Sequence, residues 1–554
     1  MLRWLGLALL FGLGAIGSTW PLASDIDQGI PLGTEAVATV PLFNLWTLAW
    51  NVESLHRGYE GYWQAPIFHP ATDTFALSEP QPVAGLVAAA ITGLGGSNLV
   101  AYNLILISAL ALNGLLAAAL FRQAGMRWLP AITGGALVVL LPFTHQELGV
   151  LQLVPLAGVL LFALAVLRFA CRPGLGAGAG VGAGLALAYG LSAQIAVFTA
   201  LAAAPAILCL WWPHRRCRRA WGGVAVGAGL FLLFVSPLVI NQMRATADAG
   251  FTRSTETVLK QSAQPTHYLT SPWPTLVPTP GIEVAEKPSG RAFWPGTLRV
   301  LMAFAGLVLA WSRPRWRRLA VAGATLLLSS VLWSFGAHLG IGDLSLLDAL
   351  RPIPGLAQIR SFFRFALLAQ LAVVGLSAGA LQLLLERTEG FSAKWWSRLL
   401  VASAVVLVLL DLRPTMGPIE PVPPLSLELP WVSWVERETT ANEVLAFVPF
   451  PQGRSARAYL GTSQWMYWQM RHWRPMVNGY SGFFPATFRS LKKSMETFPA
   501  PEALQALHDA GVRYCIVHRR LIENSPPPDP HAPIQLVPAF RDEQHGLAIF
   551  ELRG

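Results

Sequence analysis

Charged side chains are scarce in this chain, and their scarcity excludes most soluble folds. Only 13% of the 554 residues are Asp, Glu, Lys or Arg, against about a quarter in soluble domains. Hydrophobic residues make up 53% and are gathered in long uncharged runs. A run of about 20 apolar residues, wound as a helix, matches the hydrocarbon layer of a bilayer. The composition therefore predicts a polytopic α-helical membrane protein.

Cysteine is rare as well, and the familiar cofactor motifs are missing. Cys171, Cys209, Cys217 and Cys515 are too few and too scattered for a disulfide framework or a thiolate metal site. There is no Walker A loop and no His-Glu-x-x-His zinc motif. The net charge of +10 comes from Arg clusters between apolar runs rather than from one basic face. Nucleic acid is therefore not a predicted partner.

Eleven apolar runs predict eleven transmembrane spans. Residues 1–20 also resemble a signal peptide, but a retained first helix keeps the later topology consistent. The predicted spans are 4–20, 98–121, 128–143, 148–169, 175–190, 192–212, 221–240, 297–312, 319–336, 361–385 and 397–412. A twelfth apolar stretch, 82–95, is short, and a crossing there would invert every later loop. It is predicted to be an interfacial or re-entrant helix.

The basic residues predict which side of the membrane each loop faces. Lys and Arg beside spans are retained in the cytoplasm. With a cytoplasmic N-terminus, every basic cluster falls on the cytoplasmic side of the inner membrane, and the C-terminus lies outside. The clusters are Arg122 and Arg127; Arg168 and Arg172; Arg215, Arg216, Arg218 and Arg219; Arg313, Arg315, Arg317 and Arg318; and Arg387, Lys394 and Arg398.

This topology leaves three long segments outside, at 21–97, 241–296 and 413–554. The first contains an apolar and aromatic stretch, Leu42–Trp50, typical of a helix lying on the membrane surface. The second is polar and Pro-rich, which predicts irregular structure.

The third outer segment is long enough for a domain of its own. Strands are predicted at 444–448, 512–517 and 548–552, with a helix at 501–510 begun by a proline. The alternation predicts a small extracytoplasmic α/β domain at 413–554, following a transmembrane domain at 1–412.

Acidic residues of the first outer segment are the leading catalytic candidates. Asp25 and Asp27 stand a few residues beyond the first span. Two such carboxylates can hold a divalent cation, Mg or Mn. Alternatively, one can act as a catalytic base while the other accepts a hydrogen bond from a sugar hydroxyl. Otherwise they are an ordinary solvated pair. Glu79 precedes the interfacial stretch, where it either faces the same cavity or stabilises the start of a helix at Pro80.

Two further groups of polar residues are candidates for substrate binding. His69 lies in the first outer segment, and His145 and Glu147 lie at the outer end between the third and fourth spans. His145 and Glu147 either line a cavity or form a polar turn. Trp468, Asn478 and Tyr480 belong to an aromatic stretch of the last segment, which suits either sugar stacking or contact with the membrane part.

Arg360 and Arg364 stand at an outer helix start, against the positive-inside trend. Their i, i+4 spacing predicts that both guanidiniums lie on one helix face. Arginine forms forked hydrogen bonds with phosphate oxygens, so a lipid phosphate or pyrophosphate is the natural partner. The alternatives are snorkelling to lipid headgroups or pairing with Asp343 or Asp348.

Taken together, this layout resembles the C-type glycosyltransferase superfamily of polyprenyl-phosphate-sugar-dependent membrane enzymes. The likeness rests on the first span, the acidic outer loop, the many later spans and the outer C-terminal domain. Several strings are similar to those of an uncharacterised bacterial branch: residues 65–70 (APIFHP), 101–104 (AYNL), 360–365 (RSFFRF) and 477–483 (VNGYSGF). The W-W-D-Y-G-type motif of oligosaccharyltransferases is not found.

The resemblance implies transfer of a sugar from a polyprenyl-phosphate donor to an envelope acceptor, which is a lipid, glycan or protein. Asp25 or Asp27 would be the base or the hydroxyl-orienting acid, with inversion at the anomeric carbon. Arg360 and Arg364 would hold the phosphate leaving group. The alternatives are a transporter or flippase of a lipid-linked glycan and a non-catalytic assembly protein. Transporters usually carry ionisable groups mid-span and paired repeats, whereas these acids and arginines gather at the outer boundary.

Overall fold

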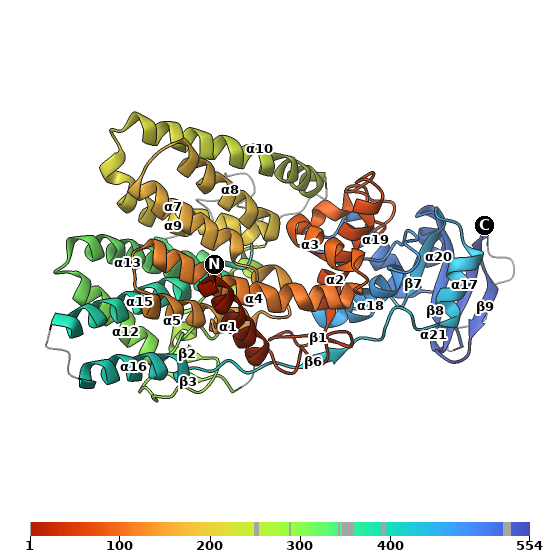
Figure 1. The fold of residues 1–554 in the computed structure, drawn as a ribbon. Coiled ribbons are helices and arrows are strands. Elements are labelled where there is room, and N and C mark those ends of the chain that lie inside the picture. Colours follow the sequence, from red (N-terminus) through yellow and green to blue (C-terminus); the bar gives the residue numbers. More distant parts are fainter. Residues whose placement is uncertain are drawn as a thin grey trace.

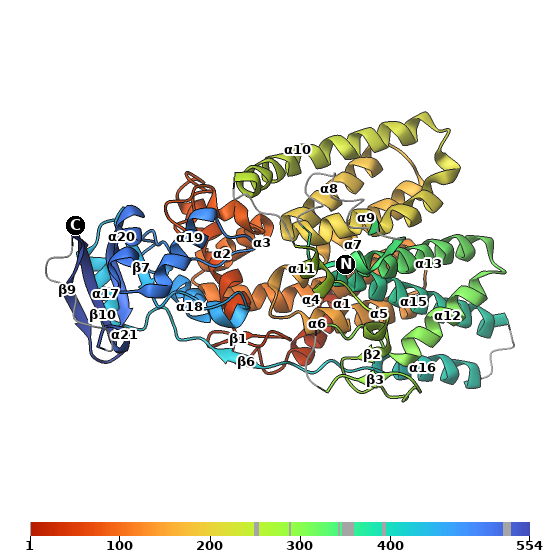
Figure 2. The same ribbon diagram turned by 180° about the vertical axis from the view of Figure 1, so that it is seen from behind.

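The computed structural model is a bundle of helices with a small β-sheet at one end (Figure 1). It describes residues 2–248, 254–286, 290–341, 344–345, 359–390, 395–523 and 533–554. Both views place the C-terminal sheet at the end of the molecule, beyond the first outer segment (Figures 1 and 2).

Each of the eleven predicted spans contains a helix. These are α1 (Leu2–Ser18), α4 (Asn98–Gln123), α5 (Trp128–Val139), α7 (Ala157–Cys171), α8 (Leu175–Leu191), α9 (Ala193–Trp211), α10 (Arg218–Asp248), α12 (Thr297–Ala310), α13 (Pro314–Ser334), α15 (Ala366–Gly390) and α16 (Trp395–Leu410). In the described chain, 6 helical stretches are long and apolar enough to cross a membrane by length and composition. The number eleven therefore stays a prediction.

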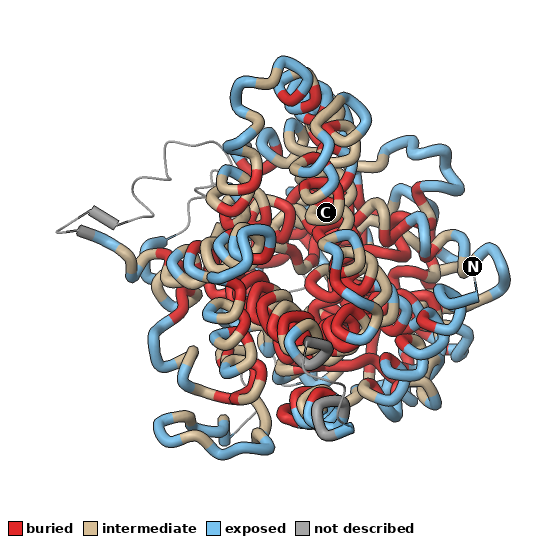
Figure 3. The backbone as a smooth tube through the Cα atoms, turned by 60° about the vertical axis from the view of Figure 1, so that its left-hand side comes forward, coloured by how far each residue is buried: buried red, intermediate tan, exposed pale blue. Residues whose placement is uncertain are grey.

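The helices α15 and α10 differ in how much of their surface is buried in the bundle. The most apolar window of the stretch Phe362–Arg387, which includes most of α15, is 78% buried, whereas that of Arg218–Ala247 in α10 is only 17% buried. Large apolar side chains of α10, including Leu233 and Phe234, are therefore exposed. Figure 3 shows the buried positions gathered inside the bundle. Apolar surface of this extent on the outside of a bundle is typical of contact with lipid.

The Arg-rich loops meet at one end of the bundle. Arg315 Nη2 donates to the carbonyl of Ala124 over 3.1 Å, and Arg318 donates to the carbonyl of Leu210. Arg313 pairs with Glu386 at 3.3 Å. The ends of α4, α9 and α15 that carry Ala124, Leu210 and Glu386 therefore lie beside the loop between α12 and α13 and the start of α13, as the cation count predicts for a single side of a membrane.

The first outer segment folds at the opposite end. It contains β1 (Gly29–Pro31), α2 (Thr39–His56), η1 (Thr74–Leu77) and α3 (Pro82–Gly93). The strand β1 pairs antiparallel with β6 (Ile419–Pro421), which follows the last helix of the bundle.

The helix α2 was expected on the membrane surface, and that expectation is wrong. Of its 18 positions, 14 are buried, including the polar Asn44, Thr47 and Asn51. Asn51 donates to the carbonyl of Pro80 over 2.7 Å, and the Gln81 side chain donates to Asn44 over 2.7 Å. These bonds satisfy the polar groups inside the protein, so α2 serves as a core helix. The aromatic residues that suggested a membrane surface pack against the C-terminal region instead.

The helix α3 packs on α2 through a glycine. A Cβ atom at Gly85 would lie 2.4 Å from Cβ of Asn51, so only glycine allows this approach. On its outer face, Leu86 and Val87 are 53% and 44% exposed. A helix with one buried and one apolar exposed face agrees with the predicted interfacial stretch, although its membrane depth stays a prediction.

The C-terminal region contains a four-stranded sheet in the order β7-β8-β10-β9. Its strands are β7 (Val444–Val448), β8 (Val512–His518), β9 (Gln535–Asp542) and β10 (Leu547–Arg553). The β7–β8 pair is parallel, and the other two pairs are antiparallel. The accompanying helices are α17 (Pro430–Glu438), α18 (Leu460–Gln469), α19 (Ala486–Ser494), α20 (Pro501–Asp509) and α21 (Arg519–Glu523). The predicted strands at 444–448, 512–517 and 548–552 and the helix at 501–510 are all present.

One hydrophobic core joins this sheet to the first outer segment. Trp46 of α2 donates its indole N–H to the Gln469 side chain over 3.0 Å. The backbone N–H of Phe68 donates to the carbonyl of Asn478 over 3.1 Å. The predicted boundary between 412 and 413 therefore does not separate two hydrophobic cores.

The remaining described elements are short. The second outer segment holds α11 (Thr255–Lys260), η4 (Pro265–Leu269), β2 (Thr270–Ser271) and β3 (Glu283–Val284). The others are α6 (Pro142–Gln146), η2 (Leu151–Leu153), η3 (Trp212–His214), η5 (Gly336–His338), β4 (Gly340–Ile341), β5 (Leu344–Ser345), η7 (Phe362–Phe365), η8 (Ala456–Tyr459) and η9 (Met495–Thr497).

Candidate active site

Arg364 lies in η7, directly before the central helix α15. Its Nη1 donates to Gln194 Oε1 over 2.7 Å, and its Nη2 lies 3.8 Å from Glu147 Oε2. The side chain of Arg364 is 17% exposed and that of Glu147 is 6% exposed. Nε of Arg364 is buried and has no hydrogen-bond partner among the described residues. The guanidinium therefore keeps donor capacity that the protein does not use.

Aromatic packing holds η7 in place. The Phe365 ring stacks on Phe198 with centroids 3.8 Å apart, and Phe362, Phe363 and Phe365 are all buried. The guanidiniums of Arg291 and Arg364 lie 5.4 and 5.7 Å from the centroid of Phe363. Phe363 is thus a shared platform for two cations.

Arg360 lies near Arg364, but the two residues do not belong to one helix. Residues 360 and 361 are not helical, because η7 begins at Phe362 and α15 only at Ala366. The expectation of one helical face is therefore wrong. Surrounding protein lowers the pKa of Arg360, and the positive charge of Arg364 lowers it further, so the two cations are neighbours. The side chain of Arg360 nevertheless remains exposed to solvent.

Three carboxyl groups, those of Glu35, Glu79 and Glu147, lie near these arginines, and Glu147 is the most buried of them. It follows α6, in a loop over which the first outer segment packs, where the Thr34 N–H donates to the Gln146 carbonyl over 2.8 Å. Burial raises the pKa of Glu147 to about 7, even though Arg364 opposes the shift. Glu147 therefore changes its charge near neutral pH.

Glu35, three residues before Ala38, the N-cap of α2, joins this candidate site, and the sequence analysis missed it. It is half-buried. Burial raises its pKa, while Arg364 and Arg360 lower it. Its Cγ would lie 3.2 Å from a Cβ atom added at Gly149, so it lies against the loop that carries Glu147. We call Glu35, Glu147, Arg291, Arg360 and Arg364 the charged cluster.

Glu79 anchors the start of the helix α9. Its two carboxylate oxygens accept from the Ser192 hydroxyl over 3.1 Å and from the Gln194 backbone N–H over 2.8 Å. A carboxylate at a helix N-terminus is stabilised by the free amides there. The helix is α9, rather than the helix after Pro80. Burial raises the pKa of Glu79, whereas its hydrogen bonds and Arg364 oppose the rise. Because Gln194 also binds Arg364, Glu79 positions that arginine indirectly.

Asp25 and Asp27 lie in the turn between α1 and β1. The Asp25 carbonyl accepts from the backbone N–H of Gly29 over 2.9 Å. Asn103 of α4 donates to the carbonyls of Ile26 and Gly29 over 2.9 and 2.8 Å, which fixes the turn. The Asp27 side chain is exposed. In the part of the chain that the structure describes, no three His, Cys, Asp or Glu side chains are grouped to hold a metal ion.

The other predicted binding residues are placed in different surroundings. Tyr480 is a neighbour of Arg360, whose charge lowers its pKa against the larger effect of burial, and its ring meets Phe43 at 5.5 Å. His145 is 1% exposed within α6. His69 lies beside Gly511 near the C-terminal sheet, where burial lowers its pKa. Arg360's predicted partners, Asp343 and Asp348, lie outside the described residues.

Asn478 and Trp468 belong to the C-terminal region. The Asn478 amide exchanges two hydrogen bonds, of 2.7 and 2.9 Å, with the backbone of Phe447 and thereby connects its own loop to β7. Trp468 lines a separate cavity against α2. Of the predicted site residues, the structure therefore brings together Glu79, Glu147, Arg360, Arg364 and Tyr480.

Comparisons with known proteins bear on the fold. No protein-family model and no curated protein matches the chain. The arabinofuranosyltransferase AftD from Mycobacteria is similar in structure, with 14% sequence identity and a TM-score of 0.58. A mutant form of AftD gives 14% identity and a TM-score of 0.56. The match covers 100% of this chain but only 40% of AftD.

The archaeal oligosaccharyltransferase AglB from Archaeoglobus fulgidus, solved with an inhibitory peptide and a dolichol-phosphate, is a more distant match. Its sequence identity is 12% and its TM-score 0.46, over 94% of this chain and 70% of AglB. At these identities the structural similarity shows the fold alone, and this conclusion rests on the comparison with AftD.

Proposed function

We propose that this chain, which has the fold of the C-type membrane glycosyltransferases, transfers a sugar from a polyprenyl-phosphate donor to an envelope acceptor. The observation that carries the proposal is the arginine pair. Arg360 is accessible to solvent and Arg364 keeps a buried donor without a partner among the described residues. Two neighbouring guanidiniums are a strong site for a phosphate group.

The arginines would stabilise the phosphate as it leaves the sugar. Negative charge develops on the leaving oxygen when the bond to the anomeric carbon breaks, and fixed cations lower the energy of that state. Arg291 would add a third cation, because it shares the Phe363 platform with Arg364. Glu79 holds Gln194 and thereby the orientation of Arg364.

Glu147 is our proposed base for the acceptor hydroxyl. A carboxyl group whose pKa is about 7 is half ionised at neutral pH, which suits proton abstraction. Attack by the activated hydroxyl on the face opposite the phosphate would invert the anomeric carbon. Glu35 lies beside Glu147 and would orient the same hydroxyl.

Asp25 and Asp27 are the alternative proposal for the base, with or without a bound Mg or Mn ion. They lie at the same end of the bundle, in the turn that Asn103 holds. Activity measured with EDTA, and again after Mg or Mn is restored, tests the metal. Asp25→Asn and Asp27→Asn test the carboxylates themselves.

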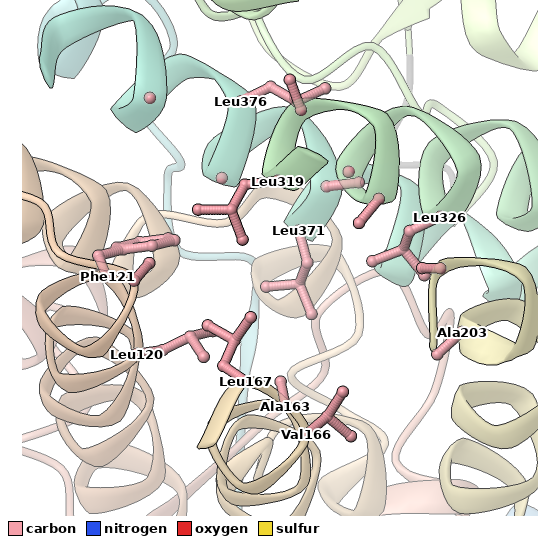
Figure 4. Close-up of a pocket in the computed structure, with 18 of the residues that line it drawn as sticks. Leu120, Phe121, Ala163, Val166, Leu167, Ala203, Leu319, Leu326, Leu371 and Leu376 are labelled. Carbon is pink, nitrogen blue, oxygen red and sulfur yellow. The ribbon is translucent and has the colours of Figure 1, made fainter. Parts of the chain in front are cut away.

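An apolar cavity inside the bundle supports a lipid-linked donor. It measures about 250 Å³ and is lined by α4, α7, α9, α12, α13 and α15 (Figure 4). Leu368, one turn after Arg364, is among the lining residues, and so is Leu383 four turns farther along α15. The lining is hydrocarbon almost throughout, so a polyprenyl chain is a suitable occupant.

We place the charged cluster on the outer face of the cytoplasmic membrane, because the Arg-rich loops gather at the other end of the bundle. The donor would therefore be consumed outside the cytoplasm, where envelope glycans, lipids and proteins are available as acceptors.

Binding of the lipid phosphate gives the direct test. The purified protein in nanodiscs is mixed with radiolabelled polyprenyl phosphate, and the bound fraction is counted. We expect saturable binding that Arg364→Ala weakens by 100-fold or more. The exposed Arg437 of α17 provides the control, since Arg437→Ala removes the same charge elsewhere. Equal binding by Arg364→Ala and the unaltered protein would reject the phosphate site.

Turnover is measured in the same preparation with polyprenyl-phosphate-linked pentoses and hexoses and an envelope extract as acceptor. We expect label from one donor to enter the extract. If every donor in the panel is bound but none is consumed, the chain is not a transferase for these sugars.

A further inference from the structure

A second cavity lies outside the membrane bundle, between α2, the segment that contains β6 and the C-terminal sheet. Its volume is about 490 Å³, within the range of small-molecule sites. Ala38 and Leu42 line it from the start of α2. The other residues important here are Gln464, Trp465, Tyr467, Trp468, His518 and His545.

Indole rings with fixed positions form one wall of this cavity. Trp465 stacks on Phe447 with centroids 4.8 Å apart and meets Trp431 edge-on at 5.5 Å. Trp468 follows one turn later on α18 and meets Tyr467 at 5.2 Å. Both Trp465 and Trp468 are only partly buried. Rings held in this way offer flat apolar faces at little entropic cost.

Polar groups stand beside the indoles. Gln464 and His518 are exposed, and His518 lies 5.8 Å from the Trp465 ring. His545 Nδ1 lies 2.9 Å from Oδ2 of the buried Asp542, which holds the imidazole in place. Among the described residues, the indole N–H groups of Trp465 and Trp468 form no hydrogen bond within the protein, so both donors remain available.

The charge of the lining limits the class of ligand. In the part of the chain that the structure describes, no Lys or Arg lines the cavity, and Glu420 is its single carboxylate. An anionic phosphate or acidic peptide would find no cation there, in contrast to the charged cluster. A purely apolar chain would leave the amide and imidazole groups without partners. The combination suits a neutral ligand with apolar faces and many hydroxyl groups.

We propose that this cavity binds neutral saccharide units of the acceptor, so that the acceptor of the transfer reaction is a glycan chain. The C–H faces of the sugar rings would lie on the indoles of Trp465 and Trp468. Gln464, His518 and His545 would form hydrogen bonds with the hydroxyls. The role of the saccharide as acceptor rests on the proposed transferase function. Binding of the saccharide does not depend on catalysis.

The connection to the charged cluster runs through the start of α2. Ala38, in the cavity wall, follows Glu35 by three residues, which span at most about 11 Å. On the same helix Leu42 lines the cavity, while the adjacent Phe43 meets Tyr480, the neighbour of Arg360. A glycan seated on the indoles could therefore reach the charged cluster with its terminal residue.

Saccharide binding is tested on the full chain in nanodiscs, without donor. The probes are neutral tetrasaccharides of arabinose, mannose, galactose and glucose, and binding is followed by saturation-transfer NMR. We expect at least one probe to bind, and Trp468→Ala or Gln464→Ala to weaken it about tenfold. Trp434 packs on Tyr514 and Phe540 of the same sheet and does not line the cavity. Trp434→Ala is therefore the matched control for loss of an indole and should bind like the unaltered protein.

The outcomes separate this inference from the proposed function. Arg364→Ala should lose polyprenyl phosphate and keep the saccharide, whereas Trp468→Ala should do the reverse. In turnover assays Trp468→Ala should raise KM for a glycan acceptor about tenfold and leave kcat nearly unchanged. The proposal is overturned if no tetrasaccharide binds the unaltered chain, or if Trp468→Ala, with an unchanged melting temperature, binds as well as Trp434→Ala does. Saccharide binding without any donor turnover would leave the cavity assignment standing and reject the acceptor role.

Discussion

Two arginines at the same end of the bundle, Arg299 and Arg364, have very different surroundings. Arg299 is fully buried, donates to the carbonyls of Leu140 and Leu412, and lies beside the buried Asp411. Arg364 donates a hydrogen bond to the side chain of Gln194, and its Nη2 lies 3.8 Å from Glu147 Oε2. Nε lacks a partner in both residues, as far as the described chain goes. An unused donor alone therefore does not identify a ligand site.

The two arginines differ in their access to solvent. Arg299 is 0% exposed, whereas Arg364 is partly exposed and adjoins the exposed Arg360. A sealed guanidinium can only hold the protein together, but an accessible pair can exchange water for a phosphate. The comparison predicts that Arg299 matters for stability and Arg364 for activity.

The largest effect is expected at Arg299. Arg299→Met removes the cation and leaves Asp411 buried without its counter-charge, which should lower the free energy of unfolding by about 3–5 kcal/mol. Denaturant unfolding in detergent measures the loss. The double variant Arg299→Met with Asp411→Asn should recover most of it, because the unpaired charge is then gone. If Arg299→Met is as stable as the unaltered chain, the pair is not structural.

Arg364→Ala should lower kcat/KM for the donor by about 10³-fold, which corresponds to roughly 4 kcal/mol of transition-state stabilisation. Its melting temperature should fall far less than that of Arg299→Met, since Arg364 is not sealed in the core. Steady-state kinetics and thermal melting are compared on one preparation. Equal losses of stability in both variants would remove the distinction between the two arginines.

Glu147 predicts a pH dependence. Its raised pKa means that the carboxylate forms only as pH rises through about 7, so kcat/KM should fall as pH drops below that value. Glu147→Gln should lower kcat/KM about 10²-fold and abolish this ascending limb. Asp25→Asn and Asp27→Asn should stay within a few-fold of the kcat/KM of the unaltered protein. Loss of the ascending limb in either aspartate variant would assign the base to that residue instead.

The smallest effect is expected at Glu79. Glu79→Gln keeps a side-chain oxygen for the start of α9 but loses the charge that orders Gln194 and Arg364. We expect KM for the donor to rise about 5-fold with kcat little changed, in line with loss of one charge-assisted hydrogen bond. A large fall in kcat with unchanged KM would show that Glu79 takes part in the chemistry.

The sequence predicted the helices well because each apolar run carries its own signal. It also placed Arg360, Arg364, Glu79 and Glu147 at one end of the bundle by counting cations. The sequence did not predict contacts between segments that are far apart in the chain. Glu35 is 112 residues from Glu147 in the chain, so no local pattern identified it. Asp25 and Asp27, two residues apart, form such a pattern and were predicted instead.

Burial was likewise hard to read from the sequence. The aromatic face of α2 suits a membrane surface and a protein core equally, and only the partners of Asn44 and Asn51 distinguish the two. The helix predicted across Arg360 begins later because Phe362, Phe363 and Phe365 pack as a 3-10 turn. That choice depends on Phe198, in a different helix.

The bond between Trp46 and Gln469 spans 423 residues of chain, and this has a consequence for biosynthesis. A ribosome releases the first outer segment long before it has made α18 or the sheet. During that interval α2 lacks the surface that buries its indoles, and the Tyr480 side of the charged cluster does not yet exist. A partly made chain therefore lacks the contacts that complete the charged cluster, so any activity of this site has to wait until α18 and the sheet have been synthesised.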